Sequence, residues 1–279
     1  MQAFYDHPHL LDGALGRVFA YIAISVIIGK LVWANRLSPP LNKGYVHKLL
    51  IFTLGTLGLI IALNSTTLEA SDPFGNKGME FADGATTMEV LFKTEFGKAW
   101  LSFWGFLLIG IAVERLPIQC LAIAGMLAAM TFSSHAGSDF PYATYWIDYV
   151  HLASTLTWLG GLTLLIVLKF TQPAIIGVDE FKFFSRLALP VFLLALITGV
   201  ARAAMEYLQS QTFATAYAVT LVIKIAMVLI IMAIAFSLRR NLQHGKFAMS
   251  AYENKLSTEY FFAILLILVV SILTQLPSD

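Results

Sequence analysis

Two histidines flanking a short turn are the first side chains in this sequence that could act together. His135 closes one apolar stretch and His151 lies near the start of the next. Two antiparallel helices joined by a short loop place their adjoining ends at similar depth, so the two imidazoles can approach each other. Asp148 lies three residues before His151, on the same helix face, where it can hold the imidazole in one tautomer. Imidazole ligates copper, zinc and haem iron.

Nearby sulfur favours copper among these metals. Met130 lies one turn before His135, and thioether sulfur prefers Cu(I). His7 and His9 precede the first apolar stretch and could capture an ion for delivery to the pair. The predicted copper ligands or their supports are His135, His151, Asp148, His7, His9 and Met130. Each of these residues also has a purely structural alternative. Met130 could simply fill the core, the membrane histidines could be structural, and His7 and His9 could be incidental residues of a leader segment.

The composition shows which elements must position these residues. The chain has 279 residues, of which 58% are hydrophobic and 13% charged, whereas soluble domains have about 45–50% and about 25%. This excludes a secreted enzyme and a nucleic-acid binder, and predicts a polytopic all-α membrane bundle surrounded by the lipid bilayer. The single cysteine, Cys120, excludes an intrachain disulfide and a CxxC motif. Nucleotide loops and a His-Glu-x-x-His motif are absent, so we expect no enzyme.

Eight apolar stretches are long enough to cross a bilayer as helices, each needing about 20 residues. They use most of the chain and predict a single membrane domain over 1–279. The predicted spans are 14–34, 46–66, 97–114, 116–135, 145–169, 183–208, 213–238 and 257–276. Between the second and third spans lies an acidic loop, 67–96, which we expect to cap one membrane face or to dock a partner.

Basic loops indicate the orientation, because short loops rich in Lys and Arg stay in the cytoplasm. The loops after the first, third, fifth and seventh spans carry most of these residues. With eight spans, both termini, the acidic loop and the four candidate histidines then face the outer side. Lys224 falls near the middle of the seventh span, where a charge is costly and therefore usually has a role.

An ordered set of motifs in the second half resembles the CopD family of bacterial copper-resistance membrane proteins. These motifs are Ser134-His135-Ala136, His151-Leu152-Ala153, Trp158-Leu159-Gly160-Gly161, Arg186 with Pro190, Thr198-Gly199-Val200, Tyr217 with Leu221-Val222-Ile223-Lys224, Glu259 and Leu276-Pro277. The resemblance implies an eight-helix protein of the bacterial inner membrane that handles copper, often beside a periplasmic copper-binding protein, CopC. We expect any CopC-like partner to be a separate chain, and the 67–96 loop is longer than the family leads us to expect.

The leading functional hypothesis is therefore a copper-binding membrane protein that moves copper across the inner membrane or serves copper resistance. A haem-bearing electron-transfer protein of the cytochrome b type is an alternative, with His135 and His151 as an axial pair. A third is a scaffold or assembly subunit of a larger membrane complex, with the 67–96 loop as its interface.

Overall fold

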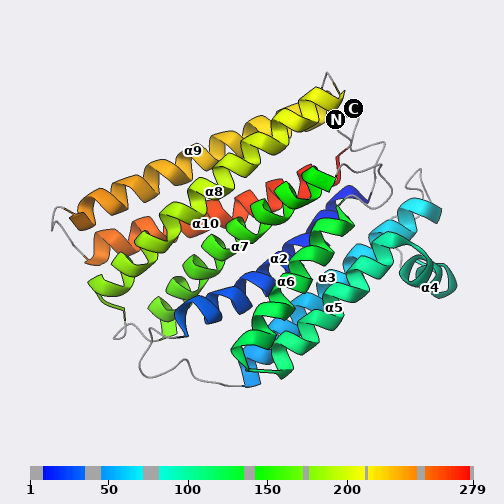
Figure 1. Cartoon of the computed structure of the whole chain (residues 1–279), viewed down its shortest axis with the longest axis horizontal. Coiled ribbons are helices and arrows are strands. Elements are labelled where there is room, and N and C mark those ends of the chain that lie inside the picture. Colours follow the sequence, from blue (N-terminus) through cyan, green and yellow to red (C-terminus); the bar gives the residue numbers. More distant parts are fainter. Residues whose placement is uncertain are drawn as a thin grey trace.

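In a computed structural model, the chain folds into a bundle of α-helices (Figure 1). The structure describes residues 9–34, 45–71, 82–134, 142–171, 176–210, 213–243 and 249–276. Within these ranges the elements are α2 (Leu10–Trp33), α3 (Tyr45–Ser71), α4 (Gly84–Lys93), α5 (Glu95–Ala112), α6 (Leu116–Ser133), α7 (Tyr142–Thr171), α8 (Val178–Ser210), α9 (Thr215–Gln243) and α10 (Met249–Leu273).

Seven of the described helices are long and apolar enough to cross a membrane, namely α2, α3 and α6 to α10. The prediction of an all-α polytopic membrane protein is confirmed. The predicted third span, 97–114, corresponds to α5, which packs against α3 and α6 and has Glu95 and Lys98 in its first turn. These two charges shorten its apolar part, and its role as an eighth span stays a prediction.

The centre of the bundle is the crossing of α2 and α7, where two glycines let the backbones meet. A Cβ on Gly29 would lie 2.3 Å from the carbonyl oxygen of Gly160, and a Cβ on Gly160 would lie 2.3 Å from that of Ser25. Membrane helices use small residues for such close approaches. Trp33 Nε1 donates a hydrogen bond to the Gly161 carbonyl at 3.3 Å.

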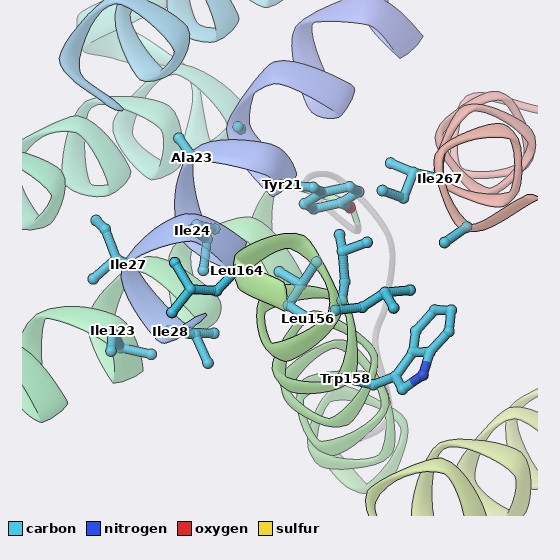
Figure 2. Packing of buried hydrophobic residues seen from close by; sticks show 14 of the residues in the cluster. Tyr21, Ala23, Ile24, Ile27, Ile28, Ile123, Leu156, Trp158, Leu164 and Ile267 are labelled. Carbon is cyan, nitrogen blue, oxygen red and sulfur yellow. The ribbon is translucent and has the colours of Figure 1, made fainter. Parts of the chain in front are cut away.

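The buried core surrounds this crossing (Figure 2). Ile24, Ile27 and Ile28 of α2 lie near Leu164 of α7, and Ile123 of α6 joins them. On the other side, Tyr21 reaches towards Ile267 of α10. These contacts hold α2 between one group of helices, α3, α5 and α6, and a second group, α7 to α10.

The bundle has two chemically different ends. At the end that we call the histidine end, α2 begins and α3, α6, α8 and α10 end (Figure 1), and Ser65 Oγ donates to the His9 carbonyl at 2.8 Å. Its described carboxylates are Asp12, Glu69, Asp83, Glu89, Glu95, Asp148 and Glu206. The opposite, basic end carries Lys48, Arg115, Lys169, Lys182, Arg186, Arg239, Arg240 and Lys255. Acidic residues thus outnumber basic ones at the histidine end, which also carries Arg17, Lys93, Lys98 and Arg202, and basic residues outnumber acidic ones such as Glu114, Asp179 and Glu180 at the other end.

Much of the described part of the 67–96 loop is helical. Asp83 caps α4, because its carboxylate accepts the backbone N–H of Thr86 at 3.1 Å. This hydrogen bond lowers the pKa of the Asp83 carboxyl below its ordinary value. Met88 and Phe92 lie one turn apart on α4 and are exposed. The loop therefore presents an apolar helical face beside the bundle as well as acidic side chains.

Candidate copper site

The described structure contains four of the six predicted site residues. They are His9, Met130, Asp148 and His151; His7 and His135 lie outside the described residues. Among the residues that are described, no group of three or more His, Cys, Asp or Glu side chains is placed to hold a metal ion. The predicted ligands His7 and His135 lie in segments that this observation does not cover.

His151 faces α8, and its hydrogen bonds define its tautomer. Its Nδ1 lies 2.9 Å from the Ala195 carbonyl oxygen and 3.1 Å from Thr198 Oγ1. A carbonyl only accepts, so Nδ1 carries the proton and donates it to Ala195. The Nε2 lone pair is then free to bind a metal or a hydrogen-bond donor. Gly199 leaves room for the ring, since a Cβ there would lie 3.0 Å from its Cε1 atom.

Asp148 is engaged in an ion-pair chain with α8. Arg202 Nε lies 3.1 Å from Asp148 Oδ2, and the same guanidinium pairs with Glu206 one turn further along α8. Arg202 and Glu206 have the i, i+4 spacing at which side chains on one helix face meet. The orienting contact on His151 that the sequence suggested for Asp148 is made by the Ala195 carbonyl.

Met130 is fully buried in the apolar core, in the last full turn of α6 before His135. The end of this helix is fixed by Arg17 of α2, which is itself buried. Its guanidinium donates to Ser134 Oγ at 2.9 Å and to the Ser133 carbonyl at 3.1 Å. Arg17 thereby ties the point at which the chain enters the His135 segment to the second turn of α2.

His9 lies at the start of α2, at the same end of the bundle, and is 4% exposed. Its Nδ1 lies 3.9 Å from an Asp12 carboxylate oxygen, and its Nε2 is buried without a hydrogen-bond partner in the described structure. Buried polar atoms almost always have a partner, so an exception calls for an explanation. An imidazole nitrogen in this state has the donor chemistry that copper requires.

Two features near the second group of helices have no clear signal in the sequence pattern. A cavity of about 300 Å³ lies among α2 and α7 to α10, with His151 and Lys224 in its wall. Glu259, which the sequence places at the start of the last span, lies well inside α10, is 3% exposed and is hydrogen-bonded to Trp158. Only the intramembrane position of Lys224 pointed towards this region.

Comparison with known proteins agrees with a copper-related family. Residues 178–273, which are α8 to α10, match the CopD family, described as copper resistance protein D. A similar protein is the copper transport protein CutJ of Bacillus subtilis (strain 168), which is 25% identical over 292 residues, covering 95% of this chain and 52% of that protein. The chain thus spans about half the length of this relative. No solved structure matches.

The fold is that of a polytopic membrane protein, and both similarities are to proteins whose names refer to copper. The predicted resemblance to the CopD family is confirmed, with the family match on α8 to α10. Lys224 and Glu259 lie inside the matched segment, whereas the motifs around His135 and His151 precede it.

Proposed function

We propose that this protein binds copper at the histidine end and moves it across the membrane as cargo. The observation that carries the proposal is the buried, unpartnered Nε2 of His9, at the end of the bundle where α6 leads into His135. His7 and His135 supply the further imidazoles in this proposal. The copper names of the matched family and of the relative support the choice of metal.

The charges support copper entry from the histidine end. A surface of one sign raises the local concentration of an ion of the other sign, and this end carries seven described carboxylates against four described cations, Arg17, Lys93, Lys98 and Arg202. The basic end then faces the cytoplasm under the positive-inside rule, so copper enters from the periplasmic side of an inner membrane. A separate CopC-like protein that delivers copper would dock here, beside the 67–96 loop and α4.

His151 is a second ligand in this proposal, deeper in the bundle. A metal-binding histidine typically donates its other ring N–H to a carbonyl or carboxylate, as His151 does to Ala195. Met130, buried in α6 five residues before His135 in the sequence, would offer a soft sulfur ligand to Cu(I) if the helix end rearranges around the ion. In this proposal Asp148 supports the site through its ion pair with Arg202 and does not orient His151 directly.

Copper uptake into proteoliposomes tests the transport proposal. Wild type, His9→Ala and His151→Ala are reconstituted with a copper-sensitive dye inside the vesicles. His47→Ala is the matched control, because His47 also has a buried ring nitrogen without a partner among the described residues, but in the first turn of α3 at the basic end. We expect copper uptake by His9→Ala to be at least tenfold slower than by wild type, and uptake by His47→Ala to proceed at the wild-type rate.

Two results would contradict this proposal. One is uptake by His9→Ala at the wild-type rate, and the other is equal loss in His9→Ala and His47→Ala. A Soret band in the purified wild type would instead support the haem alternative.

A further inference from the structure

The cavity among α2 and α7 to α10 is walled mainly by apolar side chains. Its volume is about 300 Å³, in the range of small-molecule sites. Three aromatic side chains, Tyr21, Trp158 and Phe192, line it together with many aliphatic ones. Its titratable groups other than Tyr21 are one imidazole, His151, and one ammonium, Lys224. A fixed ammonium opposes the passage of a cation and offers it no ligand.

The two polar groups have complementary unused capacity. His151 donates its Nδ1 proton to Ala195, so its Nε2 is an acceptor. Lys224 is a donor, and the part of the chain that the structure describes gives its ammonium no hydrogen bond or close ion pair. A ligand that both donates and accepts a hydrogen bond at its polar positions, and is apolar elsewhere, would satisfy both.

The charge balance around Lys224 favours an uncharged ligand. Asp148 attracts the ammonium and Arg202 repels it. Arg202 also pairs with both Asp148 and Glu206. The two formal positive charges of this group therefore match the two negative charges. Adding an anion would unbalance a group that is already neutral within the membrane, where uncompensated charge is expensive.

The cavity opens sideways to the lipid, between α8 and α9. Val200, Ile225 and Leu229 line the cavity and yet are 63%, 51% and 53% exposed on the surface of the bundle. α8 packs mainly on α7, and α9 packs on α10, which leaves the gap between them. A second cavity of about 260 Å³ continues from the first towards the basic end and shares Trp158, Phe192, Leu196 and Ile231 with it.

We propose that this cavity binds a lipid-soluble quinol or quinone. The ring would lie among Tyr21, Trp158 and Phe192, with one oxygen accepting from Lys224 and the hydroxyl of the quinol form donating to His151 Nε2 when copper does not occupy that atom. The second cavity and the opening between α8 and α9 would hold the isoprenoid tail. The ring of such a ligand thus matches the aromatic wall, and its oxygens match the two polar groups. Its tail matches the lateral opening.

Quenching of Trp158 fluorescence by a benzoquinone with a ten-carbon tail tests the parts of the site that quinone and quinol share, namely the ring, the tail and the hydrogen bond from Lys224. Quinone rings quench tryptophan at short range, so a bound ring reports its own position. We expect saturable quenching in wild type, most of which disappears in Trp158→Phe. Lys224→Met should raise the dissociation constant at least tenfold, because it removes a charge-assisted hydrogen bond in an apolar site. Lys169→Met, at the basic end of α7, is the matched control and should bind as wild type does.

A second variant and a competitor keep the test decisive. Ala203→Leu fills part of the cavity without changing a charge. It should abolish saturable quenching, and no quinone should copurify with this variant. Quenching that never saturates, or that survives both variants, would overturn the proposal. Displacement by an equal concentration of a long-chain carboxylate would overturn it in favour of an anionic lipid. Copper content measured in Lys224→Met separates this proposal from the copper function, and should equal that of wild type.

Discussion

The crossing of α2 and α7 makes a quantitative prediction about Gly160→Ala. The added Cβ would lie 2.3 Å from the Ser25 carbonyl oxygen and 2.8 Å from the Gly29 nitrogen, both of which are backbone atoms. Ordinary van der Waals contact begins near 3.4 Å, so the two helices must separate by about 1 Å. Overpacking of this kind typically costs about 1–3 kcal/mol.

The separation also weakens the rest of the interface. A radial gap of about 0.5–1 Å forfeits a quarter to a half of a dispersion contact. The hydrogen bond from Trp33 to the Gly161 carbonyl, already 3.3 Å long, would lengthen, which puts about 1 kcal/mol at risk. We therefore expect Gly160→Ala to lower the free energy of unfolding by about 1–3 kcal/mol, because the better helix propensity of alanine, about 1 kcal/mol, offsets part of the sum of these two costs.

Titration of the purified protein from mild detergent into dodecyl sulfate, followed by circular dichroism, measures this change. Gly105→Ala on α5 is the matched control, because a Cβ there meets nothing within 4 Å. Alanine is about 1 kcal/mol better than glycine inside a helix, so the control should be neutral or more stable. A Gly160→Ala protein within about 0.5 kcal/mol of wild type would refute the close crossing as a source of stability.

Three further predictions concern other parts of the bundle. Arg17→Met removes the guanidinium that holds Ser134, and should lower stability by about 3 kcal/mol in the same titration; no loss would contradict its structural role. Asp83→Ala should speed hydrogen exchange at the Thr86 amide, because it removes the cap. In wild type the pKa of Asp83 is lowered, so the cap is fully formed above the ordinary aspartate pKa and is lost as the pH falls through the lowered pKa. Cys120, the one cysteine, is exposed near the basic end. A membrane-impermeant maleimide should not label it in intact cells, because that end faces the cytoplasm. Labelling would contradict the inferred orientation.

Hydropathy predicted the helices well and their ends less well. The span predicted as 183–208 corresponds to α8, Val178–Ser210, and the span predicted as 257–276 corresponds to α10, Met249–Leu273. Helices continue past the apolar stretch into polar residues such as Asp179 and Glu180, because backbone hydrogen bonding does not stop where the lipid does. Asp83, followed by Gly84, caps α4, although aspartate before glycine is equally common in turns.

The candidate site was less predictable than the fold, because sequence does not fix how a lipid-exposed helix is rotated. In soluble helices an apolar stripe marks the buried face, but α7 and α8 are apolar on most sides. The Arg202–Glu206 pair is local and follows from spacing, whereas the Asp148–Arg202 pair and the contact of His151 with Ala195 join different helices. The hydrogen bonds of Arg17 to α6 bridge more than a hundred residues of sequence.

The copper content of the purified protein, measured by plasma mass spectrometry after equilibration with buffered copper, tests the proposed copper site most directly. We expect copper bound to wild type and to His47→Ala, and at least a tenfold weaker affinity in His9→Ala and in His135→Ala. X-ray absorption at the copper edge should show nitrogen ligands whose number falls in His9→Ala. Copper retained by His9→Ala and His135→Ala at wild-type affinity would contradict a copper site at the histidine end.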